Sequence, residues 1–145
     1  MVLKPNKTYR MCIDYRKINA IAKPFAYPLP FMDTIMYELR KARYISTMDM
    51  SSGYYQIPMH KDSIKYTAFT VPGMGLFEFL RLPFGLSGAP AVFQELRDTV
   101  TGPELEPYCF CHLDDIILAT EGFEMHLEIL EKILIRLRDA NLIIN

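Results

Sequence analysis

Apolar residues recur along the chain with two different spacings, which predict a mixture of helices and strands. Residues 123–142 carry the longest run of helical spacing. The apolar stripe expected on this helix is formed by Leu127, Leu130, Leu134 and Leu137. Residues 31–42 have the same periodicity over a shorter span. A further helix is expected from Ser87, as its N-cap, to about Val100, because Pro90 suits a first helical turn.

Alternating or β-branched stretches predict the strands. They cover residues 10–15, 43–50, 108–112 and 115–120, and a hairpin whose arms are 66–71 and 76–82. Glycines in the turn between these arms need no role beyond the turn itself. Three prolines make 22–30 an extended connector, 101–107 is expected to be a loop, and 142–145 resembles the start of another strand. Hairpins outnumber βαβ units in this order, so the predicted fold class is α+β.

Composition and charge limit the classes of protein to which the chain can belong. The chain has 145 residues, half of them hydrophobic, which predicts a folded core and excludes a disordered chain. Sixteen Lys and Arg against seventeen Asp and Glu give a net charge of -1, so any nucleic-acid contact must come from local basic patches. No apolar run is long enough to cross a membrane, and the N-terminus lacks the apolar centre of a signal peptide.

Three cysteines, Cys12, Cys109 and Cys111, are too few and too irregular for a disulfide scaffold. The "CFCH" stretch lacks the C-x-x-C spacing of a zinc site, and no second ligand pair stands elsewhere. Buried free thiols are therefore expected, in a protein of the cytoplasm or nucleus that is not secreted. His60 and His126 are expected at the surface rather than as ligands.

Paired acidic residues suggest a site for metal binding or catalysis. Asp114 and Asp115 stand side by side between two apolar runs, and Asp49 ends another apolar strand. Aspartate is a common turn residue, so a hairpin tip alone explains the pair. If the two strands are neighbours, however, the carboxylates gather at one sheet edge and repel each other unless a cation lies between them. Mg²⁺ prefers such hard oxygen ligands, so the spacing also permits a two-metal nucleotidyl-transfer site.

Six segments carry a more specific pattern, in order along the chain. They are "RMCIDYRKIN" (10–19), "YPLPFMDTI" (27–35), "STMDMSSGYYQIPM" (46–59), "KYTAFTVPGMGLFEFLRLPFGLSGAPAVFQ" (65–94), "HLDDIIL" (112–118) and "HLEILEKILIRLRDANLIIN" (126–145). Together they resemble the reverse transcriptase domain of gypsy-class LTR retrotransposons and, more distantly, that of retroviruses. The resemblance covers nearly the whole chain.

This resemblance implies a polymerase palm, with an antiparallel sheet backed by helices, and part of the fingers. It implies one partial reverse transcriptase domain over residues 1–145, with the thumb, connection and RNase H regions absent. The implied activity is RNA-directed DNA polymerase, transferring a dNTP to a primer 3′-OH. The implied partners are an RNA or DNA template with its primer and the rest of a Pol polyprotein, with no membrane partner.

The resemblance also implies roles for particular residues. Asp49 and Asp114 correspond to the ligands of two Mg²⁺ ions, for which Mn²⁺ is a possible substitute, and Asp115 corresponds to a supporting catalytic carboxylate. Arg10 corresponds to the arginine that contacts the incoming triphosphate. Tyr54 corresponds to the ring that crowds a ribose 2′-OH, although core packing also explains it. The nucleotide pocket is expected to be lined by Phe84 and Gly85.

The main departure from the family pattern is at His112, and a milder one is at Tyr55. His112 stands two positions before the aspartate pair, where the family usually carries tyrosine and sometimes phenylalanine. Histidine is smaller and titrates near neutral pH, so weakened polymerisation is expected. The alternative interpretation is therefore a catalytically inactive retroelement remnant, truncated and altered at His112.

Overall fold

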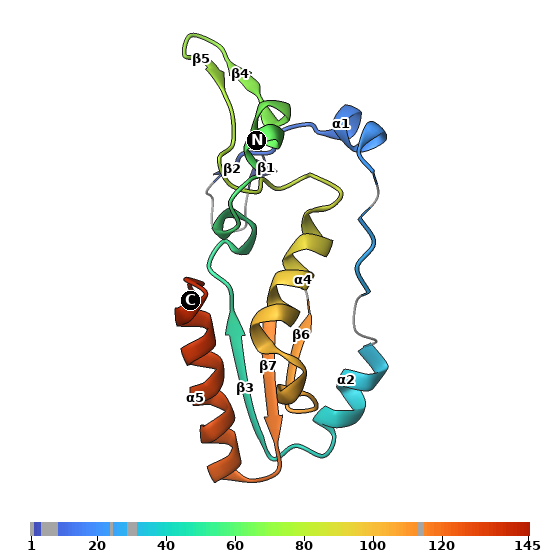
Figure 1. Cartoon of the computed structure of the whole chain (residues 1–145), viewed down its shortest axis with the longest axis vertical. Coiled ribbons are helices and arrows are strands. Elements are labelled where there is room, and N and C mark those ends of the chain that lie inside the picture. The colour runs from blue at the N-terminus through green and yellow to red at the C-terminus, as the bar shows by residue number, and fades with distance from the viewer. Residues whose placement is uncertain (1, 4–8, 24, 29–31, 113–114) are drawn as a thin grey trace. The chain divides into compact units, whose positions relative to one another are not determined.

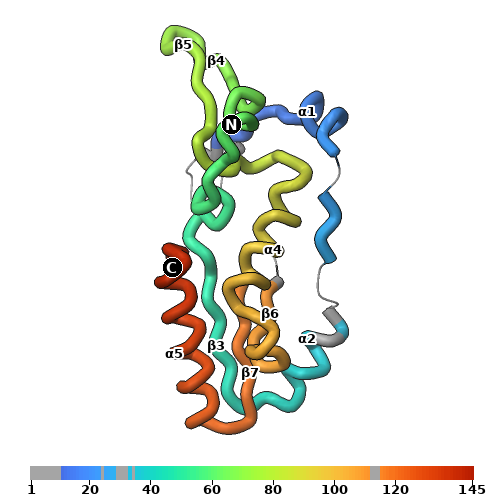
Figure 2. Tube along the Cα trace, viewed as in Figure 1, coloured from blue at the N-terminus to red at the C-terminus, as the bar shows by residue number. Residues whose placement is uncertain are grey.

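The structure, a computed structural model of the whole chain, describes residues 2–3, 9–23, 25–28, 32–112 and 115–145 (Figures 1 and 2). It divides into two compact units. Unit 1 consists of Met1–Phe25 and Tyr54–Ala89, and unit 2 consists of Ala26–Gly53 and Pro90–Asn145.

A three-stranded antiparallel sheet forms the centre of unit 2. Its strands are β3 (Tyr44–Asp49), β6 (Cys109–His112) and β7 (Asp115–Thr120), in the order β3-β7-β6. The longest pairing, β3 with β7, runs from Tyr44 opposite Thr120 to Asp49 opposite Asp115. The strands predicted at 43–50, 108–112 and 115–120 are thus present, with ends shifted by at most one residue.

Helices cover one face of this sheet. They are α4 (Ala89–Thr101) and α5 (Phe123–Asp139), and Figure 1 shows α5 running alongside β3 and α4 beside β6 and β7. The covered face carries Met48, Ile116 and Leu118, all of them buried, because alternate residues of a strand point to the same side. Unit 2 also holds α2 (Met32–Leu39) and a 3₁₀ turn, η3 (Pro103–Leu105). The helices predicted from the 31–42 and 87–100 patterns are confirmed, although the second begins at Ala89.

The buried stripe of α5 differs from the predicted one. The residues buried on this helix are His126, Ile129, Ile133 and Leu137. Leu127 and Leu134 lie at the surface, with 48% and 41% of their area exposed. Since helical spacing alone fits either stripe, contact with the sheet decides which face is buried. The helix also ends at Asp139, before the predicted residue 142, and Asn141 follows with a left-handed φ of 56°.

The expectation that His126 lies at the surface was wrong, whereas His60 is exposed as predicted. His126 is 5% exposed, and its two ring nitrogens lie 2.8 Å from the Ser46 hydroxyl and 3.0 Å from the Thr120 hydroxyl. Both ring nitrogens therefore have partners on the sheet, which removes most of the cost of burying the imidazole.

Unit 1 consists of short elements. They are β1 (Val2–Leu3), β2 (Tyr9–Arg10), α1 (Arg16–Ile21), η1 (Gly53–Gln56), α3 (Lys61–Ile64), η2 (Lys65–Thr67), β4 (Phe69–Val71) and β5 (Gly75–Phe77), with η1 starting at the last residue of unit 2. The β4–β5 hairpin was predicted, but its strands are shorter than expected. The first arm begins only at Phe69, because residues 65–67 form η2, where the Thr67 hydroxyl donates to the Ile64 carbonyl and accepts from the Phe79 amide.

The strand predicted at 10–15 was wrong beyond Arg10. Residues 11–15 have no regular structure, and α1 follows them. The Asp14 carboxylate accepts hydrogen bonds from both the backbone amide and the guanidinium of Arg16, which turns the chain into the helix instead of extending it. Periodicity did not reveal this helix because it has only six residues and buries none of them.

Residues 143–145 continue the sheet beside the end of β3. Met50 and Ile144 form an antiparallel bridge, so the strand expected there is present as one short pairing. The architecture as a whole is the predicted α+β fold. None of the helices in the described part of the chain combines the length and the apolar character that crossing a membrane requires.

Candidate functional site

Two carboxylates face each other where β3 ends and β7 begins. Asp49 is the register partner of Asp115. Directly opposed residues of an antiparallel pair point to the same face, with Cβ atoms about 5 Å apart. The neighbours Met48 and Ile116 are buried on the helix-covered face, so both aspartates lie on the other, solvent-exposed face. The structure thus brings together two of the three predicted carboxylates.

The other predicted residues around this hairpin are only partly described. Asp114 lies outside the described residues, and nothing beyond the backbone is described for His112 and Arg10. The backbone of His112 pairs with Asp115, so His112 occupies the next strand position across from the carboxylate. The roles assigned to Asp114 and Arg10 stay predictions.

A buried polar cluster on α4 holds the strands on both sides of the hairpin tip. Arg97 is 1% exposed, and its guanidinium donates to the Asp115 carbonyl at 3.4 Å and to the Gln94 side chain. Gln94 in turn donates to the Cys111 carbonyl at 3.5 Å and to Asp98 at 2.8 Å. One helix therefore contacts the last part of β6 and the first residue of β7.

Sequence reasoning missed this cluster. The signal that could have revealed it is a set of polar residues three and four apart on α4, at 94, 97 and 98, beside the buried Phe93. The guanidinium of Arg97 also lies 4.9 Å from the centre of the Phe93 ring, within cation–π range.

Close packing also fixes the turn that follows Asp49. A Cβ atom on Gly53 would lie 2.5 Å from Cζ of Phe93, so only glycine lets this turn approach α4. Ser52, one residue earlier, has a left-handed φ of 52°. The end of β3 is thereby fixed against α4, the helix that also holds the β6–β7 hairpin.

The donor set fits a hard divalent cation. Asp49 and Asp115 supply carboxylate oxygens on an exposed face, where water and substrate phosphate can complete the shell of Mg²⁺. Within the described ranges no group of three His, Cys, Asp or Glu side chains converges on one point, so these residues offer a pair of carboxylates rather than a closed metal cage. Such a pair is typical of sites that bind the metal together with a phosphate substrate.

The aromatic residues predicted to touch the nucleotide form a cluster in unit 1. The ring of Tyr54 meets that of Phe84 edge to face at 5.0 Å, and Tyr55 meets Phe84 in the same way at 5.1 Å. Tyr54 and Phe84 are both half-buried. Tyr54 can therefore pack against Phe84 and still present part of its ring to a nucleotide, as predicted.

Gly85 follows this cluster with a left-handed φ of 101°. The side-chain amide of Asn19 donates to the Gly85 carbonyl at 2.9 Å and accepts from the Ser87 amide at 2.9 Å. One donated and one accepted hydrogen bond of the Asn19 side chain therefore fix the loop that carries Phe84 and Gly85.

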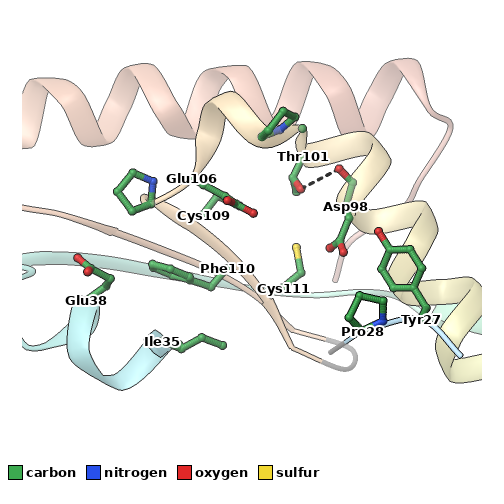
Figure 3. Close-up of a pocket in the computed structure, with 13 residues that line it drawn as sticks. Tyr27, Pro28, Ile35, Glu38, Asp98, Thr101, Glu106, Cys109, Phe110 and Cys111 are labelled. Atoms are coloured by element: carbon green, nitrogen blue, oxygen red, sulfur yellow. Dashed lines mark hydrogen bonds between the residues drawn. The ribbon is translucent and has the colours of Figure 1, made fainter. Parts of the chain in front are cut away.

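A cavity of about 580 Å³ lies beside β6 (Figure 3). Cys109 and Cys111 line it and are both 5% exposed, so the prediction of buried thiols is confirmed for this pair. Hydrogen bonding between the two thiols raises the pKa of Cys109 and lowers the pKa of Cys111. The same prediction was wrong for Cys12, which is exposed on the irregular segment before α1.

A small antiparallel sheet with helices on one face and paired carboxylates on the other has the architecture of a polymerase palm. Residues 2–145 match the family described as reverse transcriptase (RNA-dependent DNA polymerase). The chain belongs to the reverse transcriptase family, whose members are nucleotidyltransferases.

Relatives and solved structures agree with this assignment. The chain is 43% identical over 134 residues to the retrovirus-related Pol polyprotein from transposon 297 of Drosophila melanogaster, matching 92% of the chain and 13% of the polyprotein. It is 38% identical over 138 residues to that from transposon gypsy of the same organism, matching 95% of the chain and 13% of the polyprotein. The foamy viral protease-reverse transcriptase in complex with RNA/DNA hybrid superimposes with a TM-score of 0.87 at 33% identity, covering 99% of this chain and 19% of that one.

Proposed function

We propose that this chain supplies the palm and part of the fingers of an RNA-directed DNA polymerase. The reaction is transfer of a nucleotide from a dNTP to the 3′-OH of a primer on an RNA or DNA template. The observation that carries the proposal is the register of β3 and β7, which sets Asp49 opposite Asp115 on the exposed face of the sheet. Residues 1–145 are proposed to form one partial reverse transcriptase domain, made of palm and fingers.

The carboxylates are proposed to hold the metal. Asp49 and Asp114 act as ligands of two Mg²⁺ ions, or of Mn²⁺ in their place, and Asp115 supports them. When bound, such ions lower the pKa of the primer 3′-OH and take up charge on the phosphates. The part played by this chain is to hold the carboxylates in place, through the β3–β7 pairing and through the Arg97 contact to the Asp115 backbone.

Residues of unit 1 are proposed to recognise the dNTP. Arg10 contacts the triphosphate, for which a planar guanidinium suits bidentate binding. Tyr54 excludes a ribose 2′-OH, and Phe84 and Gly85 line the pocket for the nucleotide. The hydrogen bonds from Asn19 around Gly85 support this last role, because a substrate-binding loop must keep one conformation.

The partners proposed are a primed template, a dNTP and the remaining parts of a Pol polyprotein. The chain spans only 13% of the transposon 297 polyprotein, so the other regions of such a protein would supply most of the contacts to the duplex. The proposed compartment is the cytoplasm or nucleus, where the free thiols of Cys109 and Cys111 would stay reduced.

A second candidate function is favoured by one residue. His112 replaces the tyrosine that the family usually carries at this position, so the chain is alternatively an inactive remnant of a retroelement. Both candidates use the same fold, and activity alone separates them.

Primer extension on an RNA template in Mg²⁺ tests the proposal. Replacing Asp114→Asn removes a metal ligand and is expected to lower the extension rate by at least about 100-fold. The matched control is Asp139→Asn, an exposed aspartate at the end of α5, which should leave the rate unchanged. Extension that survives Asp114→Asn would contradict the metal assignment.

The effect of His112 on activity is tested in the same assay. If His112 weakens an active enzyme, His112→Tyr raises the extension rate above that of the unaltered chain. If neither protein extends the primer while both bind it, the remnant interpretation holds for this chain.

A further inference from the structure

Asn145 lies beside Asp49 on the free edge of β3. The Ser51 amide donates to the Ile143 carbonyl at 3.0 Å, and the Asn145 amide donates to the Asp49 carbonyl at 2.9 Å. Together with the bridge between Met50 and Ile144, these bonds set Asn145 opposite Asp49 in an antiparallel register. Asn145, Asp49 and Asp115 therefore form a row across three neighbouring strands.

Side chains in such a row share one face of the sheet, and a direct contact between two of them is present. The side-chain amide of Asn145 donates to Oδ2 of Asp49 at 2.8 Å. The same two residues are thus joined twice, once through the backbone and once through their side chains. The backbone bond fixes Asn145 beside Asp49, and the side-chain bond orients the Asp49 carboxylate.

We propose that Asn145 is a positioning residue that orients the Asp49 carboxylate for binding of a divalent cation. The inference rests on the proposed metal-binding role of Asp49. A carboxylate has about four lone-pair sites, so one bond from an amide leaves room for a metal. An amide side chain suits this place, because it donates a hydrogen bond and carries no negative charge of its own beside Asp49 and Asp115.

The position of the amide also matters. Asp115 flanks Asp49 on one side of the row and Asn145 flanks it on the other. Without the amide, repulsion from Asp115 would turn the Asp49 carboxylate away and raise the cost of orienting it toward an ion. Partners of this kind, which bond to a ligand rather than to the metal, commonly change metal affinity by about 10- to 100-fold.

The test measures Mn²⁺ binding to the 145-residue chain by electron paramagnetic resonance of the free ion. Asn145→Ala removes the side-chain donor and keeps the backbone bond, so affinity should fall by about 10-fold or more. The thermal midpoint in EDTA should be unchanged, because the contact is exposed. The matched control is Ile143→Ala, which shortens a 66%-exposed side chain on the same segment and should leave affinity unchanged.

Asp49→Asn separates this inference from the function on which it rests. If Asp49→Asn abolishes Mn²⁺ binding while Asn145→Ala stays within twofold of the unaltered chain, the role of Asn145 is wrong and the metal site stands. If Asp49→Asn leaves binding unchanged, the proposed metal site itself is wrong. A loss shared equally by Ile143→Ala, or a lower midpoint in EDTA for Asn145→Ala, would show a structural effect and overturn the inference.

Discussion

At the scale of single residues, the directly opposed carboxylates Asp49 and Asp115 carry a cost in stability. Like charges directly across an antiparallel pair repel each other, and no described cation forms a salt bridge with either. Asp115→Asn is therefore expected to raise the urea midpoint of the metal-free chain while weakening Mn²⁺ binding. A lower midpoint in EDTA would contradict this account of the pair.

The close approach of Gly53 to Phe93 gives a second prediction. Gly53→Ala forces a Cβ atom into the ring and is expected to destabilise the chain by about 1–3 kcal/mol in urea unfolding. A double-mutant cycle supplies the control, because Phe93→Leu removes the atoms that the new methyl group meets. The cost of Gly53→Ala should be smaller in the Phe93→Leu background, and equal costs would exclude the clash as the cause.

The ion pair that starts α1 gives a prediction about pH. Hydrogen bonds from Arg16 lower the pKa of the Asp14 carboxyl from 3.8 to about 2. Because the folded value is the lower one, the stabilising contribution is complete above pH 3.8 and is lost as the pH falls through about 2. We expect the pKa of Asp14 to rise toward 3.8 in Arg16→Met and to stay low in the control Lys17→Met. NMR titration of the Asp14 carboxyl group measures both values.

At the scale of elements, α5 tests which of its two apolar stripes stabilises the fold. Ile133 is fully buried, so Ile133→Ala is expected to cost about 2–5 kcal/mol. The neighbouring Leu134 is 41% exposed, and Leu134→Ala should cost less than about 1 kcal/mol. Urea unfolding of the two variants compares the same kind of truncation on the two faces, and equal losses would contradict the observed orientation.

The same helix shows what periodicity can and cannot predict. Spacing was enough to predict α2 and α5, the N-cap Ser87 and Pro90 predicted α4, and alternating or β-branched stretches predicted β3, β6 and β7. Spacing did not decide which stripe of α5 is buried, because Leu130 and Leu134 fit a helical face as well as Ile129 and Ile133 do. That choice depends on the sheet, whose Ser46 and Thr120 hydroxyls bond to His126.

The candidate site also has features that the sequence predicted and features that it did not. Each of two predicted strands carries an aspartate at one end, and from this the sequence predicted that Asp49 and Asp115 lie close together if the strands are neighbours. The buried Arg97 and the bond from Asn145 to Asp49 were not predicted, because both depend on partners distant in the chain. A charged residue on a helix is usually exposed, and burial of Arg97 is stabilised by partners that include the carbonyl of Asp115 and the side chain of Gln94.

At the scale of the whole molecule, metal binding should be visible as stability. An ion that binds only the folded chain stabilises it by about 2.7 kcal/mol at a concentration 100 times its dissociation constant. Mg²⁺ is therefore expected to raise the thermal midpoint of the chain in calorimetry. Asp49→Asn should abolish the rise, whereas an equal rise in that variant would assign the effect to another site.

The pairing of β3 with β7 also has a consequence for how the chain folds. The second segment of unit 1 and all of α4 lie between these strands in the sequence, so β7 leaves the ribosome long after β3. Pairings between distant segments form slowly, because a long loop must close first. We therefore expect β3 to remain unpaired during synthesis, so that its backbone edge is exposed to other chains. The charge of Asp49 is expected to reduce aggregation at this edge.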